Sequence, residues 1–265
     1  MTKILIYIVI TVPAILAGLG IAIYIFQERL IFHPEKLSKK YKFVFDQDFE
    51  EKNYQTADGN TISALLFKVE NSKGIVFYHH GNAGSLDSWG VRAIDFTSKG
   101  YDVLMYDYRS YGKSTGEIKS EKMLFADAIM IYKELLYDYK EREIIVYGTS
   151  LGTGIASYVA YNHHPSKLIL ETPYYNFYDV AKFHYPYLPN SLLLNYQFKI
   201  DQFLPKMKSE VYLFHGTEDE TVPYNSSERL AKLSDKITFF TIKDGSHNNL
   251  NTFHDYHKWL SKVLE

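Results

Sequence analysis

Residues 144–154 read IIVYGTSLGTG, and this stretch decides the fold that the rest of the sequence predicts. A β-branched, apolar run leads into Gly148, Thr149, Ser150, Leu151 and Gly152, and an apolar segment of helical character follows. The pattern is G-x-S-x-G, in which a serine lies on a sharp strand-to-helix turn that exposes its hydroxyl. An ordinary strand-to-helix turn capped by a serine is the alternative, and the motifs elsewhere in the chain argue against it.

The composition fits one α/β domain with a small appendage. Of 265 residues, 46% are hydrophobic and 16% aromatic, which is enough for a sizeable core and an aromatic-lined pocket. A formal net charge of -2 gives no electrostatic indication of nucleic-acid binding. The chain has no cysteine, which excludes disulfides, cysteine zinc sites and a lipid-anchored cysteine. We find no metal-ligand spacing and expect neither metal nor cofactor.

The amino-terminal segment 4–26 contains no charged residue. As a helix it would span roughly 34 Å, against about 30 Å for the hydrocarbon core of a bilayer. We therefore expect a single-pass transmembrane helix over 4–26. A cleaved signal peptide is the alternative, but the run is long and is followed by no small-residue cleavage site. The basic residues of a juxtamembrane linker, residues 27–42, place the following domain in the cytoplasm.

Beyond the linker, residues 43–265 alternate between short apolar runs and helical segments. The expected strands are 43–49, 53–55, 61–69, 75–78, 102–106, 143–147, 167–170, 211–214 and 238–242. The alternation predicts a mainly parallel sheet with helices on both faces and a ligand site at the carboxyl ends of the strands. Residues 172–205, rich in aromatic side chains and prolines, interrupt the pattern and predict a short cap over the site. A long loop packed as core is the alternative.

Ser150, Asp219 and His247 each follow a predicted strand at its carboxyl end. A free serine is a poor nucleophile and needs a base within hydrogen-bond reach, a role that His247 can fill. Asp219 would fix the tautomer of His247 and stabilise its protonated ring. Glu171, at the end of another strand, is the alternative acid.

Five motifs carry a resemblance to a known family: HHGNAG at 79–84, DYRSYGKS at 107–114, YGTSLGTG at 147–154, HGTEDETVP at 215–223 and GSH at 245–247. The chain resembles membrane-anchored serine hydrolases of the α/β-hydrolase superfamily. Within it, the chain is similar to the branch with an H-G-N-A-G loop, described as serine aminopeptidase-like. The resemblance implies the α/β-hydrolase fold and the Ser-Asp-His order of catalytic residues. It also implies an oxyanion hole made by the backbone N–H groups of Leu151 and Asn82, with Ala83 as the alternative to Asn82.

We therefore expect a membrane-anchored serine hydrolase that cleaves carboxylic esters or thioesters, of acyl or lipid origin, through an acyl-Ser150 intermediate. Its partners would be a small-molecule substrate and the membrane. Tyr174 and Tyr178 of the cap are candidates for contacting the substrate. One alternative is a serine aminopeptidase, which would need acidic groups to hold the substrate amine, with Glu171, Glu218 and Glu220 available. Another is a membrane-anchored interaction module without catalysis.

Two further expectations concern polar residues outside the three proposed catalytic positions. His215, in the motif that contains Asp219, is expected to be a structural or surface residue. Asp107 and Arg109 are expected to pair with each other within their loop.

Overall fold

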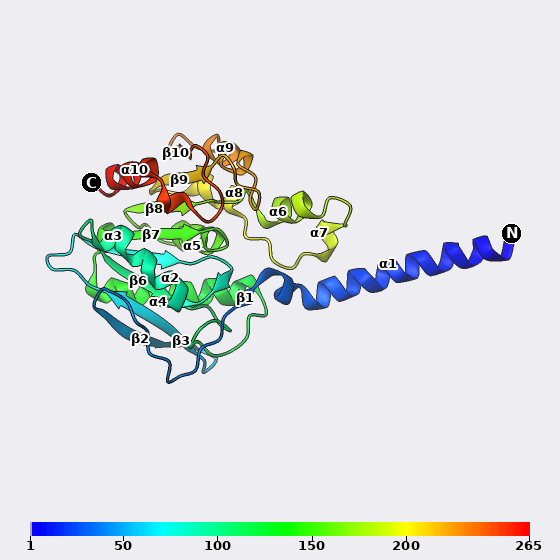
Figure 1. Ribbon diagram of the computed structural model, residues 1–265, viewed down its shortest axis with the longest axis horizontal. Helices are drawn as coiled ribbons and strands as arrows, with labels where there is room; N and C mark the ends of the chain where they lie inside the picture. Colours follow the sequence, from blue (N-terminus) through cyan, green and yellow to red (C-terminus); the bar gives the residue numbers. More distant parts are fainter. Residues whose placement is uncertain (1) are drawn as a thin grey trace.

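An eight-stranded sheet forms the centre of the computed structural model (Figure 1). The structure describes residues 2–265, except for the side chains of residues 2–14, 16 and 17. The strands of the main sheet are β2 Phe49–Gln55, β3 Thr61–Phe67, β4 Ile75–His79, β6 Asp102–Tyr106, β7 Ile144–Thr149, β8 Lys167–Glu171, β9 Glu210–Gly216 and β10 Ile237–Ile242. Their order across the sheet is β10-β9-β8-β7-β4-β6-β3-β2. The pairs β2–β3 and β3–β6 are antiparallel and the other pairs of the main sheet are parallel, so the prediction of a mainly parallel sheet is confirmed.

Side chains on the central strands alternate between two cores because successive residues of a strand point to opposite faces. Along β4, Ile75 and Phe77 join one core, and Val76 and Tyr78 join the other. All four are fully buried, as expected of a parallel strand that is covered on both sides.

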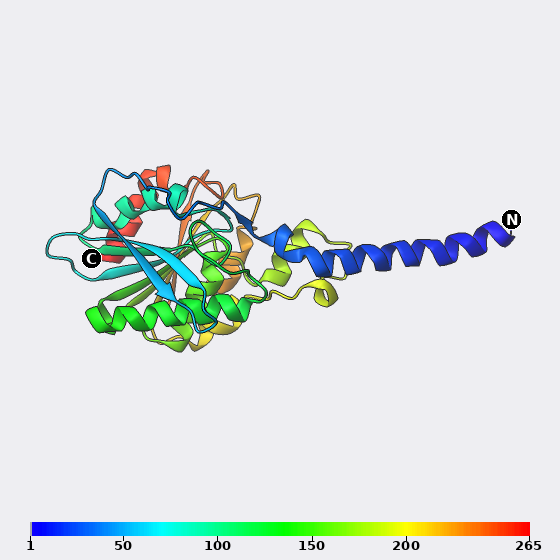
Figure 2. The ribbon, with the colours of Figure 1, turned by 90° about the horizontal axis from the view of Figure 1, so that it is seen from below.

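Helices cover both faces of the sheet, as predicted (Figure 2). One face carries α4 Glu121–Asp138, α5 Gly152–Asn162, α8 Ile200–Phe203 and α9 Asn225–Ala231. The other carries α2 Leu86–Trp89, α3 Ile94–Thr97 and α10 His254–Leu264. The described chain also contains four short 3₁₀ helices: η1 Gly90–Ala93, η2 Glu141–Glu143, η3 Leu204–Lys206 and η4 Leu250–Thr252.

The chain order of the central strands creates a place for a ligand. After β4 the chain forms β6 on one side of β4 and then β7 on the other. In open α/β sheets, ligands bind beside the carboxyl ends of the strands at such a reversal. The segments that follow β4, β7, β9 and β10 all begin at this edge.

Residues 172–205, the segment expected to form a cap, contain the two short helices α6 Phe177–His184 and α7 Asn190–Leu193, followed by α8. Asn176 caps α6 by accepting a hydrogen bond from the backbone N–H of Asp179, 2.9 Å away. Helix α7 lies beside the carboxyl-terminal part of α1 Thr2–Ile31 (Figures 1 and 2).

The residues that follow α1 are paired with loops of the main domain. The two-residue strand β1 His33–Pro34 runs parallel to β5 Ala83–Gly84, and the N–H of His33 donates to the carbonyl of Asn82 at 2.9 Å. Leu37 and Gly112 extend this pairing through a second 2.9 Å bond, from the N–H of Leu37 to the carbonyl of Gly112. Residues 33–37 are thereby fixed against the segments that follow β4 and β6.

The prediction of a transmembrane helix over 4–26 is wrong, and with it the single-pass membrane location; the expectation of a cytoplasmic domain loses its basis. Side chains 4–14, 16 and 17 of that segment lie outside the described residues. Within the part that is described, none of the helices is both long enough and apolar enough to cross a bilayer. The end of the segment packs on the domain instead: Ile23 lines a cavity there, and the adjoining Gln27 is only 3% exposed.

Arg109 does not pair with Asp107, contrary to expectation. Its guanidinium binds Asp127 of α4, with Nε 2.6 Å from Oδ2, and Asp58, with Nη1 2.6 Å from Oδ2. Asp107 instead accepts a hydrogen bond from the N–H of Leu86 at 3.0 Å, and burial raises the pKa of its carboxyl to about 8. The loop after β6 is therefore joined to α4 through a buried ion pair.

Replacing Arg109 by Ala should destabilise the fold by about 3–5 kcal/mol, because it leaves the buried carboxylate of Asp127 without its partner. Lys68→Ala is the control, since Lys68 and Glu50 form an exposed pair at 3.5 Å that contributes about 0–1 kcal/mol. Urea unfolding, followed by fluorescence, measures the loss of unfolding free energy in both variants. Equal losses in the two variants would contradict the assignment of Arg109 as a buried structural residue.

Candidate active site

Ser150 lies on a tight turn between β7 and α5. Its backbone φ of 51° is in the left-handed region that side chains other than glycine rarely adopt. The turn is held by a hydrogen bond from the Ser150 N–H to the carbonyl of Glu171 at 2.9 Å. A Cβ on Gly148 would lie 2.6 Å from the carbonyl oxygen of Gly152 and 2.8 Å from the Cβ of Ala156. Glycine at 148 is therefore what lets α5 pack this closely on β7.

The three residues predicted to act together are in contact (Ser150, Asp219 and His247). His247 Nε2 lies 2.8 Å from the Oγ of Ser150, and His247 Nδ1 lies 2.7 Å from Oδ2 of Asp219. A carboxylate only accepts hydrogen bonds, so the neutral imidazole carries its proton on Nδ1. Its Nε2 is then free to accept the proton of the Ser150 hydroxyl.

Asp219 has more hydrogen-bond donors than His247 alone. Its Oδ1 accepts from the N–H groups of Thr221 at 2.9 Å and Val222 at 2.8 Å. Its Oδ2 also lies 3.1 Å from Nε2 of the fully buried His215. Burial alone would raise the pKa of Asp219, but the hydrogen bonds from His215 and His247, the charge of His247 and the Val222 N–H outweigh it and hold that pKa well below its ordinary value.

Sequence reasoning missed the contact that His215 makes with Asp219. The ring also lies 2.7 Å from Oγ of Ser227 through Nδ1 and 3.0 Å from the carbonyl of Val222 through Nε2. The one proton on Nε2 is shared between that carbonyl and Oδ2 of Asp219, and Nδ1 accepts from Ser227, so both ring nitrogens are held. The spacing of four residues in HGTED was the available signal, because β9 ends at Gly216 and the chain turns directly after it.

Glu171, the alternative acid, lies in a different cluster. Its carboxylate is 1% exposed and accepts hydrogen bonds from Arg92 at 2.8 and 3.2 Å, from the hydroxyl of Tyr256 at 2.9 Å and from the hydroxyl of Tyr147. Burial alone would raise the pKa of Glu171, but the Arg92 charge and these hydrogen bonds lower it. Asp219, and not Glu171, is the acid in contact with His247.

Asn82, Ser150 and Leu151 line the same cavity. The side-chain Nδ2 of Asn82 donates to the carbonyl of Ile31 at 3.0 Å, and its own carbonyl accepts from Tyr111 Oη at 2.5 Å. Together with the bond from His33, these contacts hold the loop after β4 in one position. Ala83 is not among the residues that line the cavity.

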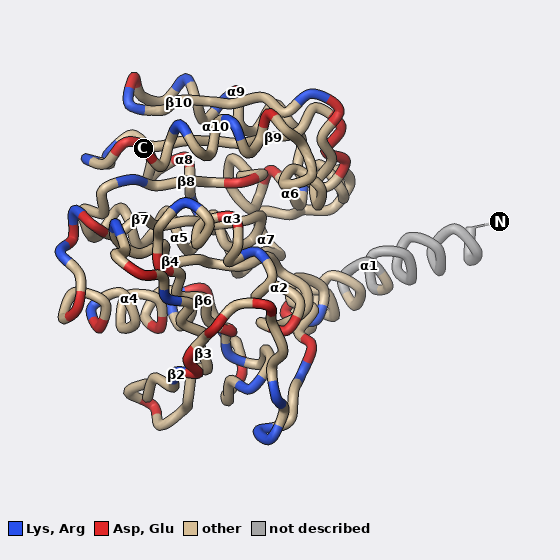
Figure 3. The backbone as a smooth tube through the Cα atoms, turned by 60° about the vertical axis from the view of Figure 1, so that its left-hand side comes forward, with Lys and Arg blue, Asp and Glu red and all other residues tan. Residues whose placement is uncertain are grey.

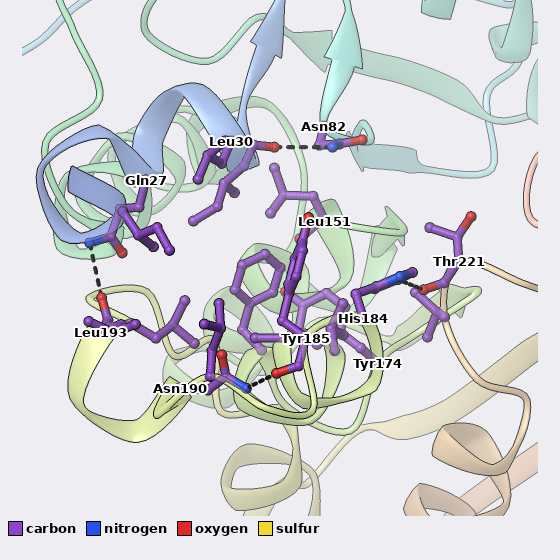
Figure 4. A pocket seen from close by; sticks show the side chains of 18 of the residues that line it. Gln27, Leu30, Asn82, Leu151, Tyr174, His184, Tyr185, Asn190, Leu193 and Thr221 are labelled. Atoms are coloured by element: carbon purple, nitrogen blue, oxygen red, sulfur yellow. Dashed lines mark hydrogen bonds between the residues drawn. The ribbon is translucent and has the colours of Figure 1, made fainter. Parts of the chain in front are cut away.

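The cavity has a volume of about 500 Å³, a size typical of small-molecule sites, and is mostly apolar (Figure 4). Helix α1, the cap and the segments after β4, β7 and β9 all contribute to its wall. The lining residues are Ile23, Gln27, Leu30, Ile31, Asn82, Ser150, Leu151, Tyr174, Phe177, Val180, Ala181, His184, Tyr185, Leu188, Asn190, Leu193, Leu194, Thr221 and Val222. Tyr174 is thus part of the wall, whereas Tyr178 is not and is 39% exposed. Among the described residues, no group of three His, Cys, Asp or Glu is arranged to hold a metal ion.

Comparison with known proteins relates this chain to hydrolases. A sequence model of the α/β hydrolase fold matches residues 74–171. The protein MT2364 of Mycobacterium tuberculosis, which carries no assigned function in its name, is 30% identical over 200 residues, or 74% of this chain and 70% of that protein. The lysophosphatidylserine lipase ABHD12 of Danio rerio is 29% identical over 187 residues, or 62% of this chain and 48% of that protein.

The fold is shared with the esterase Pf2001 of Pyrococcus furiosus, with a TM-score of 0.68 and 19% identity over 88% of this chain and 95% of the esterase. This similarity concerns the fold alone. The family model, the similarity to ABHD12 and the shared fold all indicate the same family, and the chain belongs to the α/β hydrolase superfamily.

Proposed function

We propose that this protein is a serine hydrolase that cleaves esters or thioesters of apolar acyl groups through an acyl-Ser150 intermediate. The observation that carries the proposal is the pair of short contacts, 2.8 Å from Ser150 to His247 and 2.7 Å from His247 to Asp219, with Ser150 on the wall of an apolar cavity. Membership of a superfamily with esterase and lipase relatives supports it.

In the first half-reaction, Oγ of Ser150 attacks the carbonyl carbon of the ester while its proton passes to Nε2 of His247. The negative charge that develops on the carbonyl oxygen requires two hydrogen-bond donors. We assign them to the backbone N–H groups of Leu151, the next residue in the chain, and Asn82, which lines the same cavity as Ser150. The carbon–oxygen or carbon–sulfur bond then breaks, and the leaving group takes the proton from His247.

In the second half-reaction, water attacks the acyl-serine ester and gives a proton to Nε2 of His247. Collapse of the intermediate breaks the bond to Oγ of Ser150, which recovers its proton from His247 as the carboxylic acid leaves. The ionised Asp219 stabilises the protonated imidazole in both steps. The low pKa of Asp219 keeps it ionised throughout the neutral pH range.

The cavity wall favours an uncharged acyl group over a peptide amine. Among the described residues that line it, none is Asp, Glu, Lys or Arg. An aminopeptidase needs an acidic group to hold the substrate amine, and Glu171 is already paired with Arg92. Glu218 and Glu220 are exposed and are not part of the wall. We therefore assign the cavity to an aliphatic chain.

Replacing Ser150 by Ala should abolish labelling by a fluorophosphonate probe and lower kcat for p-nitrophenyl esters by about 10⁴- to 10⁶-fold, because the nucleophile is lost. Ser157→Ala is the matched control, since Ser157 is a fully buried serine of α5 whose hydroxyl has no hydrogen-bond partner. The control should label and turn over normally. Labelling that persists in folded Ser150→Ala would place the nucleophile elsewhere.

Replacing His215 by Ala should lower kcat by about 10- to 100-fold with little change in KM, because Asp219 loses a donor that orients it toward His247. His215→Gln should recover much of kcat, since its amide nitrogen can reach Asp219. If His215 were only structural, activity would fall in proportion to the fraction of folded enzyme. Circular dichroism and active-site titration measure that fraction. Failure of His215→Gln to recover kcat in well-folded protein would contradict the orienting role.

The same substitution has a pH signature in stability. Asp219 has a native pKa below its unfolded value of about 3.9. Its contribution to the free energy of unfolding is therefore present above that pH and is lost as the pH falls. Removing His215 weakens the depression of this pKa. The difference in unfolding free energy between wild type and His215→Ala should therefore be largest near neutral pH and shrink below about pH 4.

A further inference from the structure

The carboxyl-terminal end of α1 forms part of the wall of the proposed substrate cavity. Ile23, Gln27, Leu30 and Ile31 all line it. Residues at i, i+4, i+7 and i+8 lie on one face of an α-helix, so these four side chains present one continuous stripe. From the sequence, this stretch is expected to be the end of a membrane span and the start of a linker, with no part in binding.

Gln27 joins α1 to the cap and is itself almost fully buried. Its Nε2 donates to the carbonyls of Tyr24 at 2.8 Å and Leu193 at 3.3 Å, and its Oε1 accepts from the N–H of Asn195 at 2.8 Å. Figure 4 shows the bond to Leu193 at the edge of the cavity. Because the amide is satisfied by three backbone groups, Gln27 can line an apolar cavity without an unpaired polar atom.

The cap segment opposite α1 is also free of charge. Residues 185–198 read YPYLPNSLLLNYQF and include no Lys, Arg, Asp or Glu (Figure 3). Tyr185, Leu188 and Leu193 of this segment line the cavity. An apolar chain entering between α1 and the cap would meet hydrocarbon on both sides.

The position of each α1 residue along the cavity follows from its contact with the catalytic loop. The carbonyl of Ile31 accepts a hydrogen bond from Asn82, so this end of the stripe lies next to the proposed oxyanion site. Ile23 precedes it by eight residues, which at 1.5 Å per residue is roughly 12 Å further along the helix axis. The cavity therefore has a proximal end at Ile31 and a distal end at Ile23.

We propose that residues 23–31 of α1 determine the length of acyl chain that the enzyme accepts, with Ile23 marking the distal limit. This inference rests on the proposed esterase function and adds the specificity element to it. A chain that ends before Ile23 fits between α1 and the cap, and a longer chain must displace the Ile23 side chain or leave the cavity. Each lining residue from Ile31 to Ile23 thus contacts a more distant part of the acyl chain.

The test measures kcat/KM of the full chain on p-nitrophenyl butyrate, octanoate, laurate and palmitate. In Ile23→Trp, the added bulk at the distal end should lower the palmitate-to-butyrate ratio at least about tenfold. Ile23→Ala should raise the same ratio. Leu19→Trp is the matched control, because Leu19 lies one turn earlier on α1, is 52% exposed and does not line the cavity. The ratio does not depend on the fraction of enzyme that is folded.

The outcomes separate this inference from the function on which it rests. A wild-type protein that hydrolyses none of the esters would overturn both. Ser150-dependent hydrolysis whose ratio is unchanged in both Ile23 variants, or changed equally in Leu19→Trp, would overturn only the role of α1. If Ile23→Trp does not fold, the direction of the change in Ile23→Ala decides the question.

Discussion

The site depends on the close packing of α5 against β7 around a single strained residue. A serine with positive φ is tolerated only where the surroundings hold it, and here the Ser150 N–H is fixed by the carbonyl of Glu171. Glu171 is in turn held by Arg92, Tyr147 and Tyr256. The buried cluster around Glu171 thus helps to hold the Ser150 hydroxyl in position at the edge of the sheet.

A second constraint comes from the chain that precedes the sheet. The segment from Gln27 to Leu37 is tied to the cap through Leu193 and to the catalytic loop through Asn82. The side-chain amides of Gln27 and Asn82 each donate to a backbone carbonyl, and the His33 N–H donates to the carbonyl of Asn82, so the position of α1 is coupled to that of the proposed oxyanion donor. A chain bound along α1, as proposed, would therefore contact residues that are joined by hydrogen bonds to the proposed oxyanion donor.

The strand carboxyl ends were predictable, because a polar motif directly after an apolar run marks them and parallel strands bring them to one edge. This pattern was sufficient to predict that Ser150, His247 and Asp219 lie together at that edge. Residues 43–48 were wrongly predicted as strand: the rings of Phe43 and Phe45 pack in an aromatic cluster with Phe49 and Phe67, so alternation reflected burial and not strand pairing. The partners of Arg109 and His215 and the packing of α1 depend on contacts between distant segments, which periodicity does not encode.

The central claim is that Ser150 carries the acyl group during turnover. The most direct measurement is to mix the protein with an excess of a p-nitrophenyl ester, quench with acid during the first turnover, digest the protein and locate the added acyl mass by mass spectrometry. The account predicts the acyl mass on the peptide that contains Ser150, formed with a burst of p-nitrophenol. Steady hydrolysis with the acyl group on another residue, or on none under conditions in which a burst is seen, would contradict it.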